Sequence, residues 1–201
     1  MAAVSETIVR EFFELHEFLV RQHRKYIGRD DQEDDIDFFV LNPHPQAPAG
    51  TLPFVLGSED LPFLERAVVV VKGWHTQTFS SGQLTHSPEI FRFVEPKVFQ
   101  QAARAFGKDG TPLKILVVPA LPQERQAREQ SIALLKSKGI DAVIPFHTML
   151  GDLIKQVEVN RNYQKSDLLQ IIRVLKNYDF FKEPQLELFK NRRRRGGAHS
   201  A

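Results

Sequence analysis

Two short runs of aliphatic residues limit the folds open to this chain. Residues 67–71 read AVVVV and residues 112–120 read PLKILVVPA, with little polar interruption in either. Near-continuous apolar runs of this length, rich in β-branched residues, are typical of strands buried on both faces. A sheet buried on both faces needs helices on both sides, so the sequence predicts an α/β architecture.

The other patterns give the order of the elements. A helix begins near Ser5, its predicted N-cap, and ends near residue 16, because apolar residues recur there at helical spacing. Strands are predicted at 18–27, 36–42, 67–74, 112–120 and 140–146, and helices at 95–107, 122–139, 148–159 and 166–178, with a further helix start at Ser87 and Pro88. The Pro- and Gly-rich segment 43–62 is predicted to be a long surface connection.

This order predicts a mixed central sheet flanked by helices. Three successive strands after a helix indicate a meander, so 36–42 and 67–74 should be adjacent and antiparallel. The later strand–helix–strand unit should be parallel with a right-handed crossover. We expect one domain over residues 1–180, with extra C-terminal helices, followed by a basic tail at 181–201.

Composition excludes several classes of protein. No apolar run approaches the roughly 20 residues that span a bilayer, and charges interrupt the first 18 residues, so we expect a cytoplasmic protein without a membrane partner. The chain has no cysteine, which excludes disulfides, thiolate zinc sites and cysteine nucleophiles. It also lacks the HExxH, phosphate-loop and GxSxG motifs.

Two charged residues stand in apolar strands. Asp37 begins the run FFVL, although aspartate is poorly suited to strands, and Lys72 follows the four valines. Strand alternation puts Asp37 on the face of Phe39, and Lys72 on the face of Val70, so the two charges can converge if the strands are neighbours. The structural alternative is a solvated strand end for Asp37 and a lysine that extends its ammonium to water.

These residues, in this order of elements, resemble the PD-(D/E)xK nuclease-like superfamily over about residues 5–145. The resemblance implies a restriction-endonuclease-like αβββαβ core, with Asp37 and the main chain of Val71 as metal ligands and Lys72 as a catalytic residue. It implies Mg²⁺ or Mn²⁺ as the cofactor. The sequence departs from the pattern at Val70, where the superfamily has an acid, so metal binding is expected to be weak.

Further site residues are predicted less directly. Some members of the superfamily take an acid from the first helix, and Glu14, among Phe13, Leu15 and Phe18, is the candidate; the alternative is an exposed helix face. His75 follows Lys72 closely enough to border the same site, or is simply a polar loop residue. Arg192 and Arg193 of the terminal arginine run could contact phosphates, or belong to a solvated tail.

Two classes of function remain. One is a magnesium-dependent nuclease that cuts DNA or RNA with Asp37, Lys72 and an acid such as Glu14. The other is a catalytically impaired relative that keeps the fold to bind nucleic acid or a protein partner. Val70 favours the second class. Nucleic acid is the expected partner, and a homodimer is left open.

Overall fold

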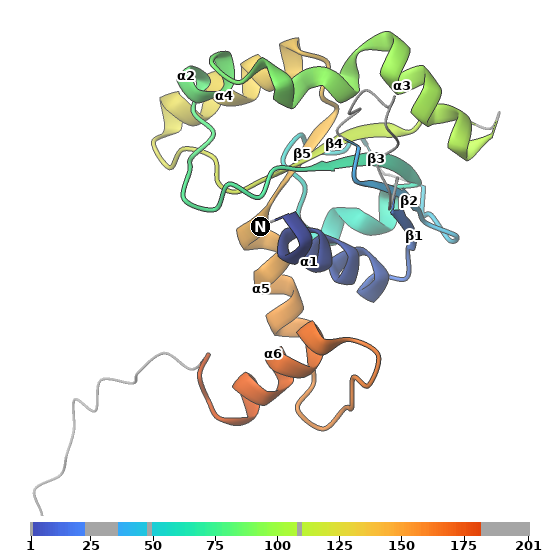
Figure 1. The fold of residues 1–201 in the computed structure, drawn as a ribbon, viewed down its shortest axis with the longest axis vertical. Helices are drawn as coiled ribbons and strands as arrows, with labels where there is room; N and C mark the ends of the chain where they lie inside the picture. The colour runs from blue at the N-terminus through green and yellow to red at the C-terminus, as the bar shows by residue number, and fades with distance from the viewer. Residues whose placement is uncertain (1, 23–35, 48–49, 108–109, 182–201) are drawn as a thin grey trace, which may run out of the picture.

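A mixed five-stranded sheet occupies the centre of the computed structural model, which describes residues 2–22, 36–47, 50–107 and 110–181 (Figure 1). Its strands are β1 (Leu19–Gln22), β2 (Phe38–Leu41), β3 (Arg66–Val71), β4 (Leu113–Val118) and β5 (Ala142–Pro145), in that spatial order. β1, β2 and β3 pair antiparallel, whereas β3, β4 and β5 pair parallel. The predicted mixed sheet is confirmed, including the adjacent antiparallel pairing of β2 with β3.

Helices cover both faces of this sheet (Figure 1). α1 (Ala2–Leu15), α5 (Phe146–Gln156) and α6 (Asp167–Asn177) lie on one side, and α2 (Ser81–Thr85), α3 (Pro96–Ala103) and α4 (Arg125–Ser137) on the other. Three 3₁₀ helices complete the described elements: η1 (Ser58–Phe63), η2 (Pro88–Val94) and η3 (Arg104–Phe106). The helix predicted from Ser87 and Pro88 is thus a 3₁₀ helix, and α2 was not predicted.

The connection predicted over residues 43–62 contains more structure than its composition indicated. η1 begins within it, and Val55 forms an isolated parallel bridge with Val143 beside the edge strand β5. The Leu56 N–H donates to the Val143 carbonyl at 2.9 Å, and Leu56 is fully buried. The segment therefore covers the outer side of strand β5, which local sequence patterns do not reveal.

The first helix starts earlier than its sequence pattern predicts. α1 begins at Ala2, so Ser5 lies inside the helix and is not its N-cap. The Ser5 side chain is 1% exposed and its Oγ lies 2.9 Å from His75 Nε2. The N-cap prediction was wrong because the helix begins three residues before Ser5, whose side chain instead contacts a residue 70 positions away in the chain. By contrast, the predicted cap Ser166 does accept the Leu169 N–H, at 3.2 Å.

β3 is buried on both faces and separates two apolar cores. Ala67 and Val69 pack with the α1 and α5 side, and Val68 and Val70 pack with the α2 and α4 side. All four side chains are 0% exposed. Full burial of a valine side chain contributes about 1.5–3 kcal/mol, so the two cores together fix the position of this strand.

A polar contact joins the end of α1 to α5. His16 Nε2 lies 2.7 Å from Asp152 Oδ2, and Asp152 is only 7% exposed. The His16 ring also makes an edge contact with Phe12, with centroids 5.1 Å apart. Because a buried carboxylate is costly without a partner, His16 is expected to stabilise the packing of the two helices.

We expect His16→Ala to lower the free energy of unfolding by about 1–3 kcal/mol, because Asp152 loses its buried hydrogen-bond partner. Urea unfolding of wild type and variant measures this difference. His44→Ala is the matched control: this histidine is exposed and should change stability by about 0.5 kcal/mol or less. Equal effects of the two substitutions would show that the His16 contact contributes nothing.

The described residues include no helix that is both long and apolar enough to cross a membrane. Of the predicted basic tail, the structure describes Phe181 alone, and Arg192 and Arg193 lie outside the described residues.

Candidate functional site

The start of β2 and the end of β3 meet at one end of the strands, because the two strands run antiparallel. We call this end of the strands the sheet edge. β4 and β5, parallel to β3, end at the same edge, which is where α/β sheets commonly bind ligands. Asp37 lies immediately before β2 and Lys72 immediately after β3. The structure therefore brings these two predicted site residues to one place.

The Asp37 carboxylate binds the main chain of β3. Its Oδ2 accepts the Val71 N–H at 2.6 Å, while the Asp37 N–H donates to the Val69 carbonyl at 3.1 Å. A side-chain oxygen here takes the place of a carbonyl acceptor where the β2–β3 pairing ends. This contact explains an aspartate at the head of an apolar strand, and it places the carboxylate beside Val71, the other predicted metal ligand.

Val70 belongs to the hydrophobic core. It is 0% exposed and lies in the cluster that contains Phe79, Leu84 and Ile90. The residues 75–94, which carry α2 and η2, supply much of that cluster. The position that holds an acid in the nuclease pattern is therefore filled by an apolar side chain and closed by other apolar side chains.

Lys72 is held in the sheet by its main chain. Its N–H donates to the Val117 carbonyl at 3.1 Å, which continues the β3–β4 pairing one residue beyond β3. The residue is partly buried. The sheet therefore fixes the backbone that carries the lysine, directly after the Val71 amide that Asp37 binds.

The residues after Lys72 contact the first turns of α1. A Cβ atom added at Gly73 would lie 2.3 Å from Ser5 Oγ, closer than real Cβ atoms come to other atoms, so a larger residue here would displace the Ser5 side chain. His75 is exposed; besides its contact with Ser5, its ring lies 4.6 Å from the Phe146 ring, centroid to centroid, at the start of α5. His75 thus borders the edge that carries Lys72 and contacts both helices.

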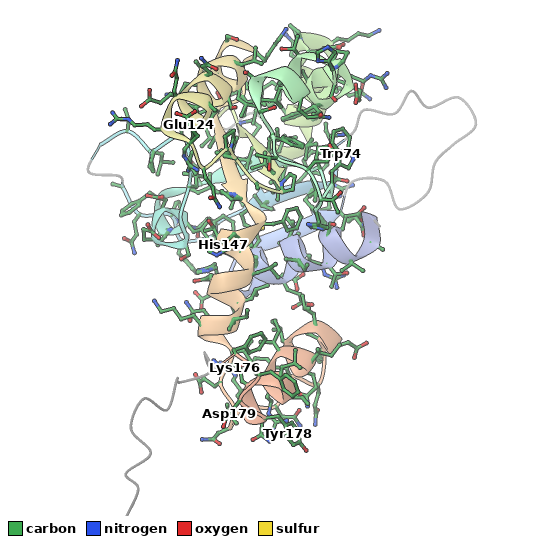
Figure 2. All side chains as sticks on the ribbon, turned by 90° about the vertical axis from the view of Figure 1, so that its left-hand side faces the viewer. Trp74, Glu124, His147, Lys176, Tyr178 and Asp179 are labelled. Carbon is green, nitrogen blue, oxygen red and sulfur yellow. The ribbon has the colours of Figure 1, made fainter. Side chains whose placement is uncertain are left out.

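Two other polar residues near this edge have defined positions. Glu124 caps α4, since its carboxylate accepts the N–H groups of Gln126 at 2.8 Å and Ala127 at 2.6 Å. His147 is exposed in the first turn of α5, in the layer on the other side of the sheet from Glu124 (Figure 2). The capping contacts give Glu124 a structural role, and both residues are exposed.

Sequence reasoning missed Glu6. Its Oε2 accepts a hydrogen bond at 2.8 Å from the amide of Gln22, the β1 residue that pairs with Phe38 at the start of β2. Glu6, Gln22 and Phe38 line a cavity of about 200 Å³. Glu6 is therefore an acidic residue of α1 that shares a cavity with the start of β2, and no local pattern distinguishes it from the other glutamates of the helix.

Glu14 lies in a different place. It is exposed and lines a groove between α1 and the segment 161–166, whose lining residues include neither Asp37 nor Lys72. Partial burial raises the pKa of the Glu14 carboxyl, and the neighbouring Arg10 opposes this rise. The structure thus does not bring Glu14 together with the other predicted catalytic residues.

The described residues do not fit a magnesium site at the sheet edge. In residues 2–22, 36–47, 50–107 and 110–181, no three His, Cys, Asp or Glu side chains are grouped to hold a metal ion. Mg²⁺ prefers octahedral oxygen coordination and commonly uses one or two carboxylates. Here Val70 offers no side-chain oxygen, and one oxygen of Asp37 already accepts the Val71 N–H.

Comparisons of this chain with protein-family models, with curated proteins and with solved structures found no match.

We expect Gly73→Ala to lower the free energy of unfolding by about 1–3 kcal/mol, because the new methyl group overlaps Ser5 Oγ. The double variant Ser5→Ala/Gly73→Ala should lose less than the sum of the two single variants, since removing Oγ relieves the closest contact. Chemical denaturation of all four proteins measures this coupling.

Gly151→Ala provides the matched control. An added Cβ at Gly151, inside α5, meets no atom within 4 Å, so this substitution should be neutral or stabilise the helix by up to about 1 kcal/mol. Additive effects of Ser5→Ala and Gly73→Ala would contradict a close contact between α1 and the residues after β3.

Proposed function

We propose that this protein is a restriction-endonuclease-like domain that binds nucleic acid and has lost the two-carboxylate metal site of a PD-(D/E)xK nuclease. The order of its elements supports this proposal: a helix, three antiparallel strands, and a later parallel strand reached through helices are the arrangement on which the resemblance rests. Asp37 and Lys72 stand at the same edge, as that arrangement requires.

The observation that carries the proposal is the complete burial of Val70. A nuclease that moved its second acid to another position would have no need to close this one with apolar side chains. Here Phe79, Leu84 and Ile90 pack in the same cluster, so the core extends to the position where a metal ligand would stand. A core side chain therefore stands where a two-carboxylate Mg²⁺ site would need its second acid.

Binding can persist without the metal. Lys72 is a phosphate-binding cation on a backbone that the sheet holds in place, and the exposed His75 lies three residues further along. Contacts of this kind neutralise phosphate charge and release counterions, without reading base sequence. Arg192 and Arg193, outside the described residues, would add further phosphate contacts if the tail reaches the same nucleic acid.

Two other outcomes are distinguishable from this proposal. An active nuclease would cleave nucleic acid in Mg²⁺ or Mn²⁺ without any substitution, and Asp37→Ala would stop it. A protein-interaction module would show no affinity for DNA or RNA at low salt. Incubation of the purified chain with labelled single- and double-stranded substrates, with and without Mn²⁺, separates all three.

Val70→Glu should destabilise the fold and create no metal site. A carboxylate placed in this apolar cluster costs roughly 3 kcal/mol or more, which for a chain of this length lowers the thermal midpoint by roughly 6–12 °C. Thermal melts with and without Mn²⁺ measure both effects, and we expect no recovery with the metal.

Val4→Glu is the control for this substitution, because Val4 is 66% exposed and the same chemical change there should leave the midpoint nearly unchanged. If Mn²⁺ restored the thermal midpoint of the Val70→Glu protein, position 70 would face a metal site. The valine at this position alone would then account for the proposed loss of catalysis.

Lys72→Gln should weaken nucleic-acid binding by a similar factor for every sequence tested. Removing one phosphate contact should also reduce the slope of log affinity against log salt by about one. Fluorescence anisotropy with a labelled duplex at several salt concentrations gives both values.

Lys97→Gln supplies the matched control for that measurement, since Lys97 is exposed on α3, away from the strand ends. The proposal would be rejected by equal losses of affinity in the two variants, because charge alone and not the position of Lys72 would then account for binding.

A further inference from the structure

A second concave site lies at the other end of α1. It is a groove of about 820 Å³ between the second half of α1, the segment 161–166 and the start of α6. This volume falls within the range of roughly 300–1,000 Å³ that is usual for ligand pockets. The charged residues that line it are Arg10, Glu11, Glu14, Glu17, Arg161 and Lys165.

Glu11 is the unusual member of this groove. It is 6% exposed, and its one interaction in the described part of the chain is an ion pair with Arg10, whose Nη2 lies 3.7 Å from Oε1. It makes no hydrogen bond to any described residue. Its carboxylate can therefore accept further hydrogen bonds, and it lines a groove large enough for a ligand to supply the donors.

Glu14 adds a second carboxylate to the same wall. It lies three residues after Glu11, so the two side chains share one face of α1. Burial in the groove raises the pKa of Glu14, Arg10 opposes the rise, and the Glu11 charge adds to it. Arg10 is the only basic residue among the groove-lining residues of α1, so these two carboxylates, which repel each other, form a wall with an excess of acidic charge.

The opposite wall carries cations that do not reach these acids. Among the described residues, neither Arg161 nor Lys165 has a carboxylate oxygen within 4.0 Å, although both line the groove with the three glutamates. The Arg161 guanidinium instead lies 5.9 Å from the Tyr163 ring centroid. Acidic and basic side chains therefore line the same groove, and no ion pair between described residues joins its two walls.

This wall is held firmly by α6. Ser166 caps that helix, and the Lys176 ammonium donates to the carbonyls of Ile154 at 2.7 Å and Val157 at 2.6 Å at the end of α5. Lys176 thus connects the lower end of the molecule to the rest (Figure 2). These hydrogen bonds fix α6, and with it this wall of the groove, against α5.

We propose that this groove binds a peptide segment that carries one guanidinium or ammonium group and one carboxylate. The cationic group donates hydrogen bonds to Glu11 and Glu14, and the carboxylate accepts them from Arg161 and Lys165. This site is separate from the sheet edge with Asp37 and Lys72, and it goes beyond the proposed binding of nucleic acid.

The test is isothermal titration calorimetry of the full chain with acetyl-Arg-Ala-Glu-amide at low salt. The uncharged acetyl-Gln-Ala-Gln-amide and the singly charged acetyl-Arg-Ala-Gln-amide are the comparison peptides. We expect the doubly charged peptide to bind most tightly and the uncharged one to show no binding. Glu11→Gln should weaken binding of the doubly charged peptide about tenfold or more, because a charge-assisted hydrogen bond is lost.

Glu95→Gln is the matched control, an exposed glutamate outside the groove, and should leave peptide binding unchanged. Arg161→Gln tests the other wall at an exposed position where folding is not at risk; it should weaken the doubly charged peptide but not the singly charged one. Equal affinity for all three peptides, or unchanged binding in Glu11→Gln, would overturn the proposal. Nucleic-acid affinity of Glu11→Gln, which should match wild type, keeps this result separate from the function proposed above.

Discussion

Burial of β3 on both faces is the constraint on which the rest of the structure depends. Its four inner residues are fully buried, two in each core, so the strand must have helices above and below it. Once it is central, β2 can join only on one side and β4 on the other. The same burial makes Val70 a core residue and removes the position from which a second carboxylate would reach the sheet edge.

The sheet edge shows how main-chain hydrogen bonding limits what a side chain can do. Asp37 accepts the Val71 N–H, and the Lys72 N–H is bound to β4, so both charged residues first complete the pairing of the strands. The sheet edge thus carries one carboxylate, one lysine and the neighbouring histidine. That set is better suited to the phosphate binding that we propose than to coordination of a divalent ion.

α1 connects the two sites that we propose. Its first turns contact the residues after β3 through Ser5, and its last turns form the acidic wall of the groove through Glu11 and Glu14. The His16–Asp152 contact fixes that end of the helix to α5. One helix thus places glutamates in two different environments. Glu6 accepts a hydrogen bond from Gln22, whereas Glu11 is ion-paired with Arg10 and accepts no hydrogen bond from the described residues.

The sequence by itself determined the order of the elements, the mixed sheet and the pairing of β2 with β3, because aliphatic runs, helical spacing and caps such as Ser166 are local signals. It also showed that valine stands where an acid was expected. Only the tertiary structure decided that Ser5 contacts His75, that Glu6 and not Glu14 lies near the start of β2, and that Glu11 is buried. Each of these depends on how α1 is rotated against elements distant in the sequence, and helical periodicity alone does not fix that rotation.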